Sequence, residues 1–351
     1  MSDTGMPEAL AVFLLFLGTL GWATLPLIPG IIELFAPRDA APLHAVGSDS
    51  GDLNFFAESF TKRALREGLF GDTVPTRLSD GSRIRTHSAD NPLPRQRTFT
   101  DFVVLTDGTP IPEGTEFASE CLARTTLQSP VGVTFRSLLG ERDVHLGEDT
   151  TVLRWVHTRG QFEAETGTRL LGRATAEHGM FLAPGVYFDR LEAGVIVVSK
   201  SAPTEVQELP PSAYERFKPR DAQAMGPNYF RIEDDLIVPA GRVLNASVIV
   251  TGNLIVEDGA RINGSVKAHE EIVVRGGGVI DGAATARGRV LVESGARVSG
   301  PIISESAVLV QSAVVGRPGT KITVSAPVVR LKPGATIYGT IMAAENGRTI
   351  P

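Results

Sequence analysis

Histidine is the side chain in this sequence best suited to acid–base or metal chemistry near neutral pH, and the chain has only six. His145, His157 and His178 lie in one repetitive stretch of the chain. Side chains on successive turns of a repeating fold stack when they are one repeat apart, and none of these three is separated from another by the 18-residue repeat described below. We therefore expect no metal triad. His269, in "KAHEE", is predicted to be an ordinary surface residue.

The other reactive side chains also lack partners at a useful spacing. Cys121 is the only cysteine, which excludes an intrachain disulfide and a cysteine-based zinc site and favours a buried thiol. The glycine-rich "RGGGVIDG" is followed by no Lys-Ser or Lys-Thr pair, so nucleotide binding is not predicted. Arg261, Arg297 and Lys332 fall near equivalent corners, where we expect their stems to cover apolar surface rather than bind sugar. The sequence predicts no catalytic, cofactor-binding or metal-binding residue.

The composition favours short strands and tight turns. The 351 residues are 42% hydrophobic, and 37 glycines and 23 prolines accompany only 6% aromatic residues. This balance suits an all-β fold better than a helical bundle. The formal net charge of -6 gives no reason to expect nucleic acid as a partner.

A short regular repeat organises the second half of the chain. Leu254 to Glu271 divides into three sixes, LIVEDG, ARINGS and VKAHEE, whose first and third residues are apolar. Residues two apart in a strand face the same side, so each six predicts a short strand with two inward side chains and a corner. Three such strands make one triangular coil of a solenoid. The inward set of this coil is Leu254, Val256, Ala260, Ile262, Val266 and Ala268.

The neighbouring coils keep this register, with Arg242 and Ser304 as polar exceptions at inward positions. After Val308 the segments "GRPGTK" and "SAP" lengthen one coil before the pattern resumes at Val329. Glycines recur at one corner, where a positive φ or close packing would explain them. These corner residues are Gly241, Gly259, Gly277 and Gly295.

A looser array precedes this one. Apolar residues recur at matching positions from 144, 162 and 180, with the same offset between starting points. Proline-rich sequence then separates the two arrays. The predicted segments are an anchor at 1–35, a linker with a short amphipathic helix at 36–100, a repeat region at 101–199, a proline-rich linker at 200–231, a second repeat region at 232–345 and a tail at 346–351.

The N-terminal anchor rests on an uncharged apolar run from Ala9 to Ile32. About 20 apolar residues span a bilayer core as a helix, so we expect one membrane crossing. A cleaved signal peptide is the competing interpretation, but no Lys or Arg precedes the run. A buried core helix is the third interpretation and fits so long a stretch least well. Arg38 follows the run and nothing basic precedes it, so the positive-inside rule favours a cytoplasmic location for the C-terminal part.

The phrase "LIVEDGARINGSVKAHEEIVVRGGGVIDGAATARGRVLVESGARVSGPI" resembles the bactofilin domain over residues 232–345. Bactofilins are bacterial cytoskeletal proteins with a right-handed parallel β-helix that polymerise without nucleotide, and many bind membranes through the N-terminus. The chain departs from the family in its long apolar run, in its additional repeat region, and in having no Phe after Phe230 for the family's aromatic end contact.

The resemblance implies a single-pass scaffold of the bacterial inner membrane that self-associates through its β-helix ends and organises cell-envelope or cell-shape proteins. The expected fold is an all-β parallel β-helix with an N-terminal transmembrane helix. The alternative is an enzyme on a β-helix, either a hexapeptide-repeat acyltransferase, for which His269 is the available histidine, or a carbohydrate-active enzyme. Counting residues does not fix the hand of the helix or the task of residues 101–199.

Overall fold

The computed structural model describes residues 8–25, 55–95, 97–199, 214–220 and 222–351. The chain divides into two units, Met1–Ser48 and Asp49–Pro351. In the first unit, helix α1 (Glu8–Thr24) is 17 residues long and exposes apolar side chains such as Phe13 and Trp22.

The described residues contain no helix with the length and apolar character that a membrane crossing requires. The predicted span from Ala9 to Ile32 is therefore not supported as a continuous helix, because the helix ends at Thr24. Most of the rest of that span, and the predicted linker up to residue 54, lie outside the described residues.

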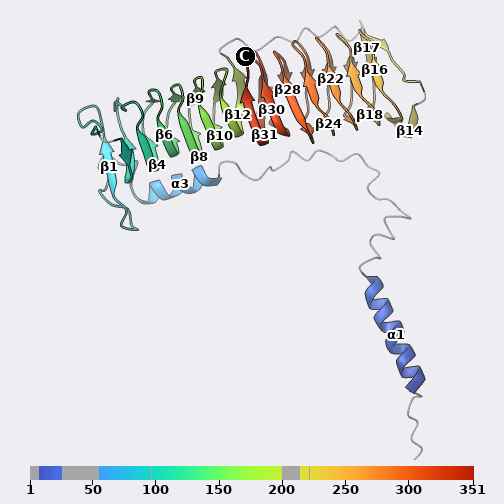
Figure 1. Cartoon of the computed structure of the whole chain (residues 1–351), viewed down its shortest axis with the longest axis horizontal. Helices are drawn as coiled ribbons and strands as arrows, with labels where there is room; N and C mark the ends of the chain where they lie inside the picture. Colours follow the sequence, from blue (N-terminus) through green and yellow to red (C-terminus); the bar gives the residue numbers. More distant parts are fainter. Residues whose placement is uncertain (1–7, 26–54, 96, 200–213, 221) are drawn as a thin grey trace, which may run out of the picture. The chain divides into compact units, whose positions relative to one another are not determined.

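The second unit confirms the prediction of an all-β repeat fold. It is a β-solenoid of about 14 turns, in which strands of successive turns pair side by side (Figure 1). Nearly every pairing between turns is parallel, and inward side chains of all three faces form one continuous apolar core.

The first array begins after helix α3 (Phe55–Arg66). Its strands are β1 (Ile84–His87), β2 (Thr98–Phe99), β3 (Phe102–Leu105), β4 (Glu116–Ala123), β5 (Leu127–Gln128), β6 (Thr134–Gly140), β7 (Val144–Leu146), β8 (Thr151–Thr158), β9 (Gln161–Ala164), β10 (Arg169–Ala176), β11 (Gly179–Leu182) and β12 (Tyr187–Val198).

The second array follows the undescribed segment 200–213. Its strands are β13 (Glu215–Arg216), β14 (Gln223–Gly226), β15 (Tyr229–Ile232), β16 (Leu236–Val238), β17 (Arg242–Leu244), β18 (Ser247–Val250), β19 (Leu254–Val256), β20 (Arg261–Ile262), β21 (Val266–Ala268), β22 (Ile272–Val274), β23 (Val279–Ile280), β24 (Ala284–Ala286), β25 (Val290–Val292), β26 (Arg297–Val298), β27 (Ile302–Ser304), β28 (Ala307–Val310), β29 (Val314–Val315), β30 (Ile322–Leu331) and β31 (Thr336–Thr349).

The register predicted for the second array is confirmed. Leu236 pairs with Leu254, Leu254 with Ile272, and Ile272 with Val290. The six inward side chains predicted for the coil at 254–271 are all buried. At one of the two polar exceptions, Arg242 is only half-buried, and the neighbouring Val243 is buried in its place.

The corner glycines adopt the conformation that the pattern predicts. Gly259 and Gly277 have φ values of 62° and 69°, a left-handed region that is costly for residues with a Cβ. A Cβ on Gly277 would also lie 3.5 Å from the backbone nitrogen of Gly259 in the preceding coil. Gly241 and Gly295 share the positive φ, so backbone conformation rather than close packing explains the glycines at this corner.

Longer side chains fill the first array. Phe99, Phe117 and Phe135 stack in successive turns, with ring centroids 5.5 and 5.0 Å apart. Successive members of this stack are register partners separated by the full 18-residue repeat, whereas later partners such as Ala174 and Leu191 are separated by fewer residues. Because the number of residues per coil varies, the repeat is less regular in the sequence of the first array.

Helix α3 covers one face of the first array. Its buried side chains Ala57 and Ala64 lie on the same stripe as Phe60, whose ring stacks 5.6 Å from Phe102 and lies 5.4 Å from Trp155. The predicted amphipathic helix therefore packs on the strands through small and aromatic residues.

The two arrays meet at their C-terminal ends. Strand β12 pairs antiparallel with β31, with Leu191 opposite Ile341 and Phe188 opposite Gly347. A Cβ on Gly347 would collide with the Phe188 ring, so glycine allows the close approach. Lys321 and Glu192 form an ion pair of 2.8 Å across the junction.

The array boundaries differ from those predicted by sequence. Paired strands begin at Ile84, inside the predicted linker, because β1 already occupies the first coil. Strands β13, β14 and β15 lie in or at the end of the predicted proline-rich linker, and β31 continues to Thr349 through most of the predicted tail. Segments without a clear sequence repeat therefore form strands at the ends of the arrays.

Candidate functional site: an arginine-lined cleft beside helix α3

The histidines of the first array have partners that their own spacing does not reveal. The Nδ1 atom of His145 lies 2.9 Å from Glu163, its register partner in the next coil, and its Nε2 atom lies 3.4 Å from Glu165. His157 bonds through Nδ1 to the Thr175 hydroxyl at 2.7 Å. The signal that sequence reasoning missed is an acidic or hydroxyl residue one coil after each of these two histidines.

The group of His145, Glu163 and Glu165 brings its possible ligand atoms within 4.8 Å of one another. The Nδ1 atom hydrogen-bonds to Glu163, and Nε2 lies at the longer distance of an ion pair from Glu165. A carboxylate on the second ring nitrogen is also what a metal-bound histidine has, so these contacts alone assign no ligand to the group.

His157 is the more buried of these histidines, and burial lowers its pKa below the ordinary value of 6.5 because the charged form loses hydration. Glu177, whose carboxylate lies 3.7 Å from Nε2, opposes this shift. The charge of Arg159 adds to it. His157 therefore contributes to the fold mainly as a neutral residue near pH 7.

A column of three arginines offers stronger binding chemistry. Arg173 and Arg190 are register partners in neighbouring coils, and Arg173 also pairs with Trp155. Arg154 precedes Trp155, so Arg154, Arg173 and Arg190 each come from one of three successive coils. We call these three residues the arginine column.

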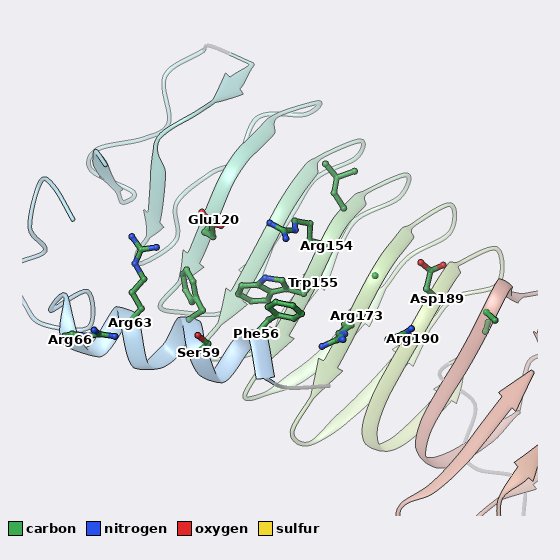
Figure 2. Close-up of a pocket in the computed structure, with 15 residues that line it drawn as sticks. Phe56, Ser59, Arg63, Arg66, Glu120, Arg154, Trp155, Arg173, Asp189 and Arg190 are labelled. Carbon is green, nitrogen blue, oxygen red and sulfur yellow. The ribbon is translucent and has the colours of Figure 1, made fainter. Parts of the chain in front are cut away.

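The arginine column and helix α3 line one cleft, in which Arg173 and Arg190 lie beyond the end of the helix that carries Phe56 (Figure 2). The cleft has a volume of about 760 Å³ and ends beside Ala343 and Ala344 of β31. Helix α3 supplies one side of the cleft because its buried stripe holds the helix against the strands. The helix residues that line it are Phe56, Ser59, Phe60, Arg63 and Arg66.

Positive charge in this cleft is largely uncommitted. Within the described residues, Arg66, Arg154 and Arg190 make no hydrogen bond and no ion pair through their side chains. Arg63 is paired with Asp80 at 2.5 Å, and the Arg173 guanidinium lies 4.9 Å from the centre of the Phe56 ring. Guanidinium groups with free donors bind carboxylates and phosphates through paired hydrogen bonds.

Two acidic side chains, Glu120 and Asp189, also line the cleft. Burial raises the pKa of Asp189 above its ordinary value, and the charge of Arg190 opposes this shift. The cleft therefore combines cationic donors with carboxylate acceptors, an arrangement that can bind a ligand carrying both negative charge and hydroxyl groups.

Irregular strand pairing shapes this wall. The registers of β4 with β6 and of β10 with β12 shift on this face, between Phe117 and Glu120 and between Leu170 and Arg173. Such bulges bend a strand and redirect its side chains. They also change the sequence offset between coils, which hides the arginine column from a search at one fixed spacing.

The residues singled out by sequence lie elsewhere. Arg261 forms an ion pair of 2.5 Å with Asp281, which also pairs with Arg317. Cys121 is fully buried, and burial raises the pKa of its thiol far above the ordinary value. The His269 side chain is half-buried and bonds to no other described side chain.

At one end of the solenoid, β13 covers β17 and β15 covers β18, whereas β16 has an open strand edge within the described part of the chain. The backbone N–H of Leu236 donates to the carbonyl of Asn253, and the carbonyl of Val238 accepts from the backbone N–H of Glu257. The backbone groups of Leu236 and Val238 therefore point toward the next coil. The groups of Ile237 between them point the other way, and they bond to no described residue. The Ile237 side chain is 50% exposed.

The opposite end is partly covered. Ile84 of β1 donates its outward N–H to Thr76, and the Asn91 side chain donates to the outward carbonyl of Thr86. The two ends of the solenoid therefore differ in their capacity to pair with another strand.

Comparison of the chain with family models, with curated proteins and with solved structures found no match.

Proposed function

We propose that this protein is a structural scaffold that self-associates through the end of its second array. The observation that carries the proposal is the open edge of β16. An unpaired strand edge at the end of a stacked core is a template for another copy, because every added backbone pair extends the ladder already present.

The bactofilin resemblance of residues 232–345 is consistent with this proposal. The regular register and buried aliphatic column of that region support a stack that could be lengthened by an identical coil. A bactofilin-like role would make the protein an organiser of cell-envelope or cell-shape proteins, with assembly that needs no nucleotide and a right-handed coil.

Membrane association is the second part of the proposal. The support is α1, where apolar side chains such as Phe13, Phe16 and Trp22 are exposed all around the helix. A helix that is apolar on every side is stable when its surroundings are also apolar. We propose the bacterial inner membrane as that environment.

Sedimentation velocity of the full chain in detergent, with negative-stain microscopy, tests the scaffold proposal. We expect concentration-dependent assemblies in the absence of nucleotide. Ile237→Pro removes the outward N–H but none of the bonds to β19, so it should abolish association while leaving the unfolding midpoint within error. Ile237→Val is the matched control, because it keeps the outward donor and should associate like the wild type.

Two results would contradict the proposal. The first is a monomer at every concentration. The second is a discrete trimer that Ile237→Pro leaves intact, which would favour the hexapeptide-type enzyme instead.

A further inference from the structure

We propose that the cleft between α3 and the first array binds a linear acidic polysaccharide, whose carboxylates are held by the arginine column. This inference goes beyond self-association and does not depend on it, because the cleft lies on the first array and the open edge on the second. It assigns a task to the array that the bactofilin resemblance does not cover.

The spacing of the arginine column favours a polymer with repeated charges. Arg173 and Arg190 are directly opposed in neighbouring strands, which lie roughly 4.8 Å apart. Like charges at such positions destabilise a sheet unless a counterion neutralises them. A chain with one carboxylate on successive sugars would neutralise both, and each guanidinium can hold a carboxylate by two parallel hydrogen bonds.

The acidic residues of the cleft distinguish a sugar polymer from a phosphate polymer. Glu120 and Asp189 lie in the same lining as the arginines. They would repel a nucleic-acid backbone, which carries a charge on every nucleotide. Sugar hydroxyls can donate hydrogen bonds to these carboxylates, so the mixture of charges suits an acidic glycan.

The floor of the cleft offers apolar contact as well. Phe56 and Trp155 lie together where α3 meets the strands (Figure 2), and the Phe60 ring lies 5.4 Å from that of Trp155. Aromatic rings beside arginines can cover the C–H faces of a sugar ring while the guanidinium groups bind its charge. Trp155 keeps 9% of its surface exposed, so a ligand in the cleft would change its surroundings.

The shape of the site argues against a membrane surface as the ligand. The lining residues surround a recess of about 760 Å³, and Trp155 within it is only 9% exposed, so a flat bilayer would not reach that ring. A single extended chain can enter the recess and follow the arginine column from coil to coil.

The binding test uses the full chain carrying Trp22→Phe, which leaves Trp155 as the only tryptophan. Titration with polygalacturonate oligosaccharides should change Trp155 fluorescence and saturate, whereas neutral galactan should not. Arg154→Gln and Arg190→Gln should each weaken binding at least ~10-fold, the scale of one lost charge-assisted hydrogen-bond pair. Arg154→Lys, which keeps charge without the planar fork, should give an intermediate loss.

Arg287→Gln is the matched control. Arg287 is exposed on the second array and makes no side-chain hydrogen bond or ion pair with the described residues. Its removal should change affinity by less than ~2-fold, as expected for a distant screened charge. Unfolding midpoints of all the variants should match, so that a loss of binding is not a loss of fold.

Equal affinity of the wild type and both arginine variants would overturn the proposal. So would equal binding of neutral galactan. Tighter binding of single-stranded DNA or of anionic phosphatidylglycerol vesicles would overturn the assignment to a glycan.

Discussion

The two arrays share a coil plan but fill it differently. The first array stacks large rings, with Phe99, Phe117 and Phe135 in face-to-face contact. The second array uses aliphatic residues of modest size, such as Val256 and Ile262, at positions that recur in every coil. The core of a coil can therefore be filled by a few large side chains or by many small ones. Only the second kind of core produces a regular repeat in the sequence.

The difference extends to the outer surfaces. The first array bears helix α3, strand bulges and an arginine-lined cleft, and its free end is partly covered. The second array is regular and has an open edge at β16. Irregularity in a repeat fold creates places for ligands, whereas regularity preserves edges that can continue the stack.

Truncation of a stacked ring should have the largest effect on stability. Phe117→Ala removes the central ring of the three, and we expect a loss of ~3–5 kcal/mol in the free energy of unfolding. In the second array, where no fully buried side chain among the described residues is as large, Ile262→Val removes one methylene and should cost only ~0.5–1.5 kcal/mol. Urea unfolding followed by circular dichroism measures both, and a loss for Phe117→Ala no larger than that for Ile262→Val would contradict the role of the stacked rings.

A corner glycine of the second array should be next in size. Gly277→Ala places a Cβ at a φ of 69° and should cost ~1–2 kcal/mol. Gly226→Ala is the control, because Gly226 has no positive φ and no neighbour within 4 Å of an added Cβ. Urea unfolding midpoints compare the two variants. If Gly226→Ala were as costly, the corner conformation would not be the cause.

The first array should also give the protein a pH dependence. Because His157 has a lowered pKa in the folded state, the unfolded chain binds more protons below about pH 6.5, and stability should fall as the pH decreases from 6.5 toward the folded pKa. His157→Gln should flatten this change. Urea midpoints between about pH 7.5 and 5.5 provide the measurement, and an unchanged slope in His157→Gln would contradict the prediction.

An exposed ion pair between coils of the second array should matter least. Arg275 and Glu257 lie 3.0 Å apart, with 45% and 27% of their side chains exposed. Solvent screening should limit their coupling to ~0.2–1 kcal/mol in a double-mutant cycle. The coupling should shrink further in high salt, and a larger, salt-independent value would mean that the pair is more buried in solution.

The sequence predicts the second array closely because inward positions, corners and register all follow from one short period. Leu254, Val256 and Gly259 lie where the pattern places them. The arginine column is not visible in this way, because bulges make the sequence offset between its coils irregular. The pairing of β12 with β31 also escapes prediction, since no repeat links strands so distant and antiparallel.

The antiparallel junction determines what kind of assembly the open edge can make. Because the chain reverses direction where β12 meets β31, both ends of the solenoid are the starting coils of an array. Two copies joined through β16 would be related by a twofold axis, and that contact uses the same surface on each copy. Such pairing closes at a dimer, and growth into a longer filament requires release of the cap that Thr76 and Asn91 form at the other end. A filament built in this way would have no polarity.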